Sequence, residues 1–244
     1  EAAIKVCFKS YNSKKKNILF SNKSYHGKLI GSGSVSGSYI KNNQFPIMEN
    51  CISFNFNDPI DLEKKILHCQ KNGGVYAVII EPYSASLLES CSQEFIDKLF
   101  SLKKETDFKI IYDEVYTGFF KSKKMFYFQN FKNDNIPDVI CLSKTLGGGK
   151  SSISCVVVDD DTYNKAYSKL SDTFLHTTTY NGFAEESLTA LVALNIIAED
   201  NFKNKVQKLC EHLNIKLKAI NEKHKNKIDE IKGTGILNGI VFKS

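Results

Sequence analysis

Short apolar runs alternate with longer amphipathic segments over most of the chain. The clearest runs are Val75 to Ile80, Lys109 to Tyr112, Val139 to Leu142 and Ile153 to Val158. Runs of this length that are rich in Val and Ile are typical of strands buried on both faces of a sheet. Strands separated by helices predict an α/β fold, in which helices cover both faces of a mainly parallel sheet.

The segments between these runs carry helix signals at their ends. Asp58-Pro59 combines an N-cap acid with a first-turn proline, and Gly73-Gly74 closes the same segment. Ser92 begins a second helix whose apolar residues fall on one face. Glu185 to Ala198 is a long apolar segment, which we interpret as a buried helix.

The pattern changes near Asn201, where lysines and glutamates lie opposite a single apolar stripe. We interpret the stripe as the face of a surface helix that packs on a core; its members are Val206, Leu209, Leu213, Leu217 and Ile220. Ile228 to Val241 then resembles a pair of strands interrupted by glycines. We therefore expect residues 1–200 to form a large domain and residues 201–244 to begin a small C-terminal α/β domain.

Both ends of the chain suggest a piece of a longer protein. The first five residues, Glu1 to Lys5, read as the inside of a helix, so we expect the large domain to lack its N-terminal part. The small domain would be truncated soon after its first strands. A targeting segment ahead of Glu1 would then lie outside this sequence.

Composition narrows the class of protein. The 244 residues are 42% hydrophobic, and all 33 basic residues behind the net charge of +6 are lysines. A nucleic-acid-binding face generally uses arginine, so we expect no nucleic-acid partner. No apolar stretch reaches the roughly 18 residues of a membrane-spanning helix, so we expect no membrane partner.

The cysteines indicate a reduced environment. There are seven, scattered along the chain without a Cys-x-x-Cys pair, and the five histidines show no zinc-type spacing to them. We therefore expect a cytoplasmic protein without a metal site.

Two residues with complementary chemistry follow successive apolar runs. Asp113 ends the run Lys-Ile-Ile-Tyr-Asp, and Lys144, 31 positions later, follows Val-Ile-Cys-Leu-Ser and precedes three glycines after Thr-Leu. That separation is about one βαβ unit, so both residues should lie at the carboxyl edge of a parallel sheet, where α/β folds bind ligands. A lysine that forms a Schiff base and an acid that pairs with a pyridinium nitrogen are what a pyridoxal phosphate enzyme needs.

Each element alone has a simpler explanation. With 33 lysines in the chain, an arbitrary lysine is usually a solvated side chain. An aspartate after a strand commonly caps a helix or forms a turn, and consecutive glycines commonly mark a tight turn. The order and spacing of the elements together favour the cofactor site.

Further motifs surround this pair. They are Ser24-Tyr-His-Gly, Ile80-Glu-Pro, Ile111-Tyr-Asp-Glu-Val-Tyr-Thr-Gly, Pro137-Asp-Val-Ile-Cys-Leu-Ser-Lys-Thr-Leu-Gly-Gly-Gly, His176-Thr-Thr-Thr-Tyr and Gly233-Thr-Gly-Ile-Leu-Asn-Gly-Ile. Over nearly the whole chain they resemble the signature of the class III pyridoxal-phosphate aminotransferases. This family includes the ornithine, acetylornithine, diaminopelargonate and 4-aminobutyrate enzymes.

The resemblance implies a fold-type-I pyridoxal phosphate enzyme and a role for each matching residue. Lys144 would hold the cofactor as a Schiff base and then move the substrate proton, while Asp113 would pair with the pyridine nitrogen. Tyr25 and Val115 would pack on the two faces of the ring. Thr179 would bind the phosphate of the neighbouring subunit's cofactor.

Two other matching positions have no expected catalytic role, and several positions depart from the family pattern. We expect His26 to stabilise a turn and Glu114 to be structural. Tyr116 stands where the family often has Gln near the ring hydroxyl. Tyr83-Ser-Ala-Ser-Leu and Lys150-Ser-Ser-Ile-Ser replace two further family segments, so the donor and acceptor stay open.

The expected activity follows from the family. The protein would move an amino group from an amine or amino-acid donor to a 2-oxo acid or aldehyde acceptor, as a homodimer with cofactor sites at the interface. One alternative is an aminomutase or racemase on the same scaffold, which would not depend on an added 2-oxo acid. The other is a non-catalytic partner subunit or fragment.

Overall fold

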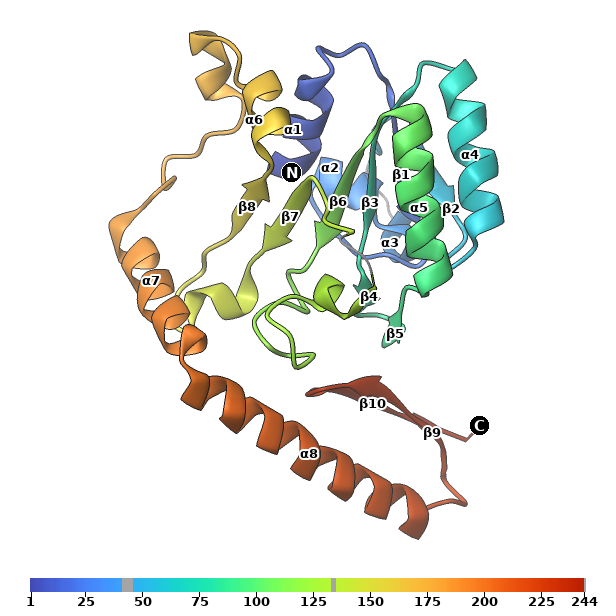
Figure 1. The fold of residues 1–244 in the computed structure, drawn as a ribbon, viewed down its shortest axis with the longest axis vertical. Helices are drawn as coiled ribbons and strands as arrows, with labels where there is room; N and C mark the ends of the chain where they lie inside the picture. The colour runs from blue at the N-terminus through green and yellow to red at the C-terminus, as the bar shows by residue number, and fades with distance from the viewer. Residues whose placement is uncertain (41–45, 133–134, 244) are drawn as a thin grey trace.

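A six-stranded sheet forms the centre of the structure, a computed structural model that describes residues 1–40, 46–132 and 135–243 (Figure 1). The strand order is β2-β1-β3-β6-β7-β8, and all neighbours run parallel except β7 and β8. The strands are β1 (Asn17–Ser21), β2 (Cys51–Phe54), β3 (Val75–Ile80), β6 (Lys109–Asp113), β7 (Val139–Leu142) and β8 (Cys155–Val158). The order changes direction between β1 and β3, and ligands bind beside such switch points in open α/β sheets.

Alternate residues along the strands face two different apolar layers. Leu19 and Val78 pack in the layer that contains the inner faces of α4 and α5. Ile18 and Ala77 pack in the opposite layer with α1, which lies beside α6. These helices are α1 (Ala2–Ser10), α4 (Pro59–Lys71), α5 (Gln93–Thr106) and α6 (Asp160–Ala166). The sheet is therefore covered on both faces, as the apolar runs predicted.

Short elements border the sheet. They are α2 (Ile30–Ser34), α3 (Gly37–Ile40), the β4 (Tyr83–Ser84) and β5 (Glu89–Ser90) hairpin, and three 3-10 turns, η1 (Tyr127–Asn130), η2 (Lys144–Gly147) and η3 (Leu170–Phe174). Most of them form the loops between the strands and helices of the sheet layers.

The predicted helix starts are confirmed. Asp58 accepts hydrogen bonds from the backbone of Ile60 and Asp61 at the start of α4. Ser92 accepts one from the backbone of Phe95 at the start of α5. These caps satisfy backbone donors that have no partner within a helix, which is why the helices begin where they do.

The strands follow the apolar runs with two differences. β8 begins at Cys155, two residues later than predicted, and lies antiparallel at the edge of the sheet. β1 and β2 were not predicted, because their short runs include polar residues such as Asn17 and Ser53. Tertiary packing on both faces still makes them strands.

Helix α7 (Ala184–Ala198) differs from the predicted buried helix. One face packs into an apolar cluster through Ala190 and Ile197. The outer face carries four large apolar side chains that are between 49% and 62% exposed: Leu188, Leu191, Val192 and Ile196. A helix that is apolar on both sides is normally covered on both sides, so the outer face lacks a cover within the described part of the chain.

The C-terminal segment forms the predicted helix and strand pair. α8 (Asp200–Lys223) is followed by the hairpin of β9 (Ile228–Thr234) and β10 (Leu237–Phe242). The predicted packing of the α8 stripe is only partial, because Leu209 and Ile220 are exposed. The expected domain boundary at residue 200 falls where α7 gives way to α8, and it stays a prediction. No helix among the described residues is long and apolar enough to cross a membrane.

The hairpin turn docks against the loop that follows β6 (Figure 1). The Ile236 N–H donates to the Lys121 carbonyl at 2.9 Å, and Leu237 is buried in a cluster with Tyr83 and Tyr127. Gly235 has a φ of +60°, and a β-carbon at this position would overlap the Lys121 carbonyl oxygen. The contact therefore requires glycine for two reasons, its positive φ and its lack of a side chain.

We expect Gly235→Ala to lower the free energy of unfolding by about 2–5 kcal/mol, because it combines a left-handed conformation with a backbone overlap. The matched control is Gly149→Ala, where φ is +72° and no atom lies within 4 Å of the added carbon. It should lower the free energy by only about 1–2 kcal/mol. Chemical denaturation of both variants measures the difference, and equal losses would contradict the docked hairpin.

Candidate active site

The two residues singled out by spacing lie at one edge of the sheet. Asp113 is the last residue of β6 and pairs in register with Cys141 of the neighbouring parallel strand β7. Lys144 begins η2, two residues beyond the end of β7. The prediction that both residues emerge at the carboxyl edge is confirmed.

Asp113 is held by two hydrogen bonds. The Val115 N–H donates to Oδ1 at 3.0 Å, and the His26 ring contacts Oδ2 through Nδ1 at 2.8 Å. Each carboxylate oxygen accepts one hydrogen bond and retains a lone pair for a further donor. The carboxylate is therefore oriented and still able to bind a ligand.

The prediction that His26 stabilises a turn is confirmed for its backbone N–H but does not describe its ring. Its imidazole does not stabilise a local turn; it reaches Asp113, 87 positions away in the sequence, and is only 2% exposed. The turn is stabilised instead by the His26 backbone N–H, which donates to Ser36 Oγ at 2.7 Å. The aromatic-His-Gly motif was the signal for this residue, but its partner depends on how β1 and β6 lie in the sheet.

Lys144 is exposed and conformationally unusual. Its φ is +47°, a region that residues with a side chain seldom adopt and that is often found at functional sites. Its ammonium lies 5.8 Å from the centre of the Tyr116 ring. The side chain is therefore presented to solvent at the sheet edge and not packed away.

Two hollows adjoin at this edge. One, about 500 Å³, is lined by residues that include His26, Asp113, Val115, Ser154 and Thr178. The other, about 420 Å³, borders Lys144 and also contains Ser154. Both volumes are in the range of small-molecule sites.

Two other predicted residues, Tyr25 and Thr179, do not line the larger hollow. Tyr25 donates its backbone N–H to Glu81 at 2.8 Å, but the residue is 42% exposed and does not line the larger hollow. Thr179 is exposed, and its neighbour Thr178 lines the hollow instead. The structure thus brings Asp113 and Val115 together and does not bring Thr179 to the site of its own chain.

Two buried acids hold the loops around the site. Glu81 accepts backbone N–H groups from Tyr25 and Ala85, and burial raises the pKa of its carboxyl. Glu114 accepts hydrogen bonds from the Thr117 hydroxyl and from the backbone of Tyr127 and Phe128, and burial likewise raises its pKa. The structural role predicted for Glu114 agrees with this geometry.

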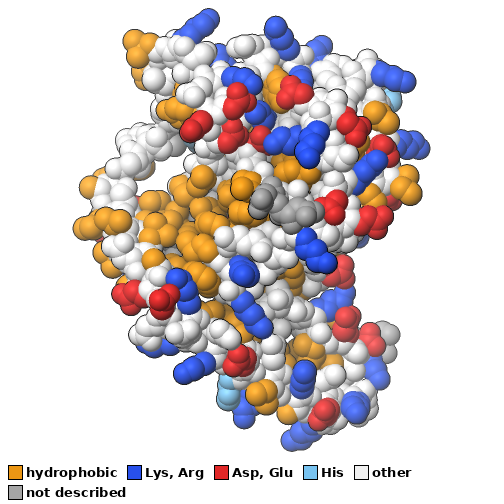
Figure 2. All heavy atoms as spheres, viewed as in Figure 1, with side chains coloured by type: hydrophobic (Ala, Val, Ile, Leu, Met, Phe, Trp, Pro, Cys, Tyr) orange, Lys and Arg blue, Asp and Glu red, His pale blue; other side chains and the backbone are white. Residues whose placement is uncertain are grey.

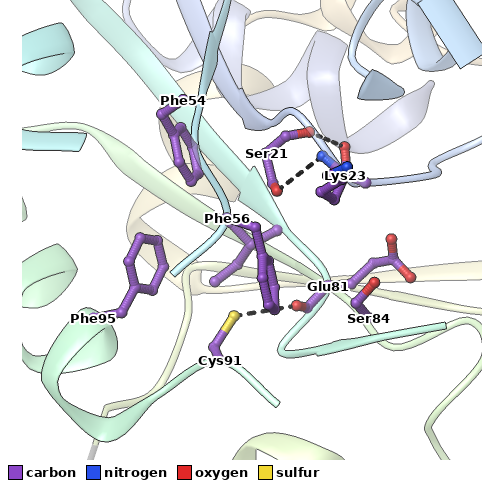
Figure 3. Close-up of a pocket in the computed structure, with 10 residues that line it drawn as sticks. Ser21, Lys23, Phe54, Phe56, Glu81, Ser84, Cys91 and Phe95 are labelled. Atoms are coloured by element: carbon purple, nitrogen blue, oxygen red, sulfur yellow. Dashed lines mark hydrogen bonds between the residues drawn. The ribbon is translucent and has the colours of Figure 1, made fainter. Parts of the chain in front are cut away.

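A further pocket, which is apolar, lies beside Glu81 and shares no lining residue with the two hollows. Figure 3 shows Phe54, Phe56, Phe95 and Cys91 around it, with the Cys91 thiol donating to the Glu81 carbonyl. The space has a volume of only about 10 Å³, which is about enough for one water molecule. It is too small for a substrate.

The residues at the sheet edge fit pyridoxal phosphate, the group that the resemblance implies. An oriented carboxylate with free lone pairs suits a pyridinium nitrogen, and an exposed lysine suits a Schiff base. Val115 lines the hollow together with Asp113, and Tyr25 is exposed. No cluster of three potential metal ligands occurs among the described residues.

These features define a class of α/β proteins that bind a ligand at the carboxyl edge of a mainly parallel sheet. The sequence profile of one such family, the class III aminotransferases, matches residues 1–244. The chain belongs to this family.

A curated relative supports the match. The putrescine aminotransferase of Pectobacterium atrosepticum is 29% identical over 248 residues, which cover 100% of this chain and 52% of the relative. The chain therefore spans about half the length of that protein.

Solved structures share the fold. Ornithine aminotransferase from Toxoplasma gondii matches with a TM-score of 0.85 at 21% identity, over 100% of this chain and 57% of that one. Taurine:2-oxoglutarate aminotransferase from Bifidobacterium kashiwanohense, solved with pyridoxal phosphate and glutamate, matches with a TM-score of 0.82 at 22% identity, over 99% and 57%. The predicted fold-type-I architecture is confirmed.

Proposed function

We propose that the full-length protein is a pyridoxal-phosphate-dependent aminotransferase. It would move an amino group from an amine or amino-acid donor to a 2-oxo acid or aldehyde acceptor. The observation that carries the proposal is the position of Asp113 and Lys144 at one sheet edge, with His26 hydrogen-bonded to Asp113.

Asp113 would set the electronic state of the cofactor. Pyridoxal phosphate, when bound, supplies a carbonyl that condenses with amines and a ring that accepts electrons from the reacting carbon. The Asp113 carboxylate would keep the ring nitrogen protonated, and the His26 contact would hold the carboxylate in the orientation for this pairing. His26 is thus a positioning residue and does not itself meet the substrate.

Lys144 would hold the cofactor through its Nζ and then act as the base. A lysine amine released near a cationic group can carry a proton to and from the substrate carbon. Its exposure at the sheet edge and its place beside the Ser154-lined hollow support this role.

If Lys144 holds the cofactor, borohydride reduction of the full-length protein should fix a phosphopyridoxyl group on Lys144, because only an amine forms the reducible bond. Peptide mass spectrometry locates the label. Lys144→Ala should abolish it, and the control Lys150→Met, which removes an exposed lysine six residues away, should not. A label spread over surface lysines would contradict the assignment.

Asp113→Asn should lower kcat about a hundredfold or more, because a neutral amide cannot hold the ring nitrogen protonated. The control Asp159→Asn makes the same chemical change at the N-cap of α6, where Asn also caps well. It should keep full activity. Transamination rates with an added 2-oxo acid measure both variants, and activity without that acid would favour an aminomutase.

We also propose that the protein works as a homodimer. The outer face of α7 is apolar and exposed, and Figure 2 shows hydrophobic side chains gathered beside this helix. Tyr180 and Phe183, just before α7, are exposed as well. Thr179 lies in the same exposed segment, where it would meet the cofactor of a second copy.

The double variant Leu188→Glu/Val192→Glu should shift the protein from dimer to monomer, because charges on the outer face of α7 would be buried without partners. Ile60→Glu is the matched control, since Ile60 is 78% exposed on the separate helix α4. Sedimentation velocity measures the mass of each. A wild-type monomer, or a dimer unchanged by the double variant, would rule out this interface.

A further inference from the structure

Lys121 is a half-buried cation close to the candidate site. It lies in the loop after β6, and its ammonium donates to the Tyr116 carbonyl at 2.9 Å. Within the described residues, no carboxylate reaches salt-bridge distance of this ammonium; Glu114 acts on it only at longer range. Burying an ammonium without a counter-charge is unfavourable, so the position is suited to an anionic ligand.

The Tyr116 ring connects Lys121 to the reacting lysine. The Lys121 ammonium lies 5.7 Å from the centre of this ring, and the Lys144 ammonium lies 5.8 Å from the same point. The two amines therefore border the same ring, and the charge of Lys144 acts on Lys121. Burial, and then the charge of Lys144, lower the pKa of Lys121 to about 8.

The backbone of Lys121 is fixed by the C-terminal hairpin. The Ile236 N–H donates to its carbonyl, and Gly235 leaves no space between the two segments. Tyr116 packs at the edge of the cluster that contains Leu237. The backbone that carries the Lys121 side chain is therefore held in place before a ligand binds. A binding group that is already ordered loses less conformational entropy on binding.

We propose that Lys121 binds the carboxylate of the amino acceptor, a 2-oxo acid, beside the reacting amine of Lys144. The inference rests on the proposed aminotransferase function and names the acceptor class for the same site. This chain has no arginine, so the charged donors that it can offer to a carboxylate are lysine and protonated histidine. A charged donor forms the stronger hydrogen bond.

The lowered pKa of Lys121 supplies a pH dependence. Lys121 is a cation below its pKa of about 8 and neutral above it. Its attraction for a carboxylate should therefore be present at pH 7 and lost as the pH rises through 8 to 9. A bound carboxylate would itself raise the pKa, which shifts the loss to slightly higher pH.

The kinetic test uses the full-length protein loaded with pyridoxal phosphate and compares two kinds of acceptor. Pyruvate and 2-oxoglutarate carry a carboxylate, and propanal does not. Lys121→Met keeps an unbranched side chain one atom shorter and removes the charge, so it should raise KM for the 2-oxo acids at least tenfold and leave KM for propanal unchanged. Lys121→Arg should restore 2-oxo acid binding and abolish its loss between pH 7 and pH 9, because arginine stays charged.

A binding measurement provides a readout without turnover. Glutarate, an unreactive dicarboxylate, should bind the wild-type protein in calorimetric titration and bind Lys121→Met at least tenfold more weakly. Weakened cofactor binding in Lys121→Met with unchanged acceptor KM would instead assign Lys121 to the cofactor phosphate and overturn the proposal. A fall in thermal stability with equal effects on all acceptors would show that Lys121 only braces its loop.

The outcomes separate this inference from the proposed function. If the wild-type protein transfers no amino group to any acceptor, the proposed function fails, while glutarate binding that depends on Lys121 still supports the carboxylate site. If the wild-type protein transaminates and Lys121→Met leaves glutarate binding and 2-oxo acid KM unchanged, only the role of Lys121 fails.

Discussion

The parallel pairing of β6 with β7 is the constraint on which the candidate site depends. Asp113 is in register with Cys141, so the chain leaves both strands at the same edge and Lys144 follows two residues after β7. The relative position of Asp113 and Lys144 comes from the backbone ladder. That ladder is buried between two apolar layers, so the packing of the core fixes the relative position of Asp113 and Lys144.

Two buried acids at the ends of strands hold the neighbouring loops against the sheet. Glu81 follows β3 and accepts the backbone N–H of Tyr25, and Glu114 follows β6 and accepts hydrogen bonds from Tyr127 and Phe128. Hydrogen bonds to a charged group contribute about 1.5–3 kcal/mol each, and losing one leaves a buried polar group unpaired. Glu81 therefore holds the loop that contains Tyr25, and Glu114 holds the loop after β6. Together with the contact of His26 with Asp113, these hydrogen bonds fix the loops around the candidate site.

The loop after β6 also joins the sheet to the C-terminal segment. It begins with Asp113 and Glu114, carries Tyr116 beside Lys144, and meets the hairpin turn at Lys121. Leu237 completes an apolar cluster with residues from both sides of this contact. One loop therefore runs from Asp113, past Lys144, to the C-terminal hairpin, so a change in hairpin position would reach the candidate site through few residues.

The sequence by itself determined the fold class, the strands β3, β6 and β7, the capped helices α4 and α5, and the Asp113–Lys144 pair. These follow from local information: continuous apolar runs, cap residues and the length of one βαβ unit. Only the tertiary structure decided the partner of the His26 ring, 87 positions away, the exposure of the outer face of α7, and the contact of Lys121 with the turn of the C-terminal hairpin. The physical reason is that these contacts join segments far apart in the chain, and their partners depend on strand order and layer packing, which no local pattern encodes.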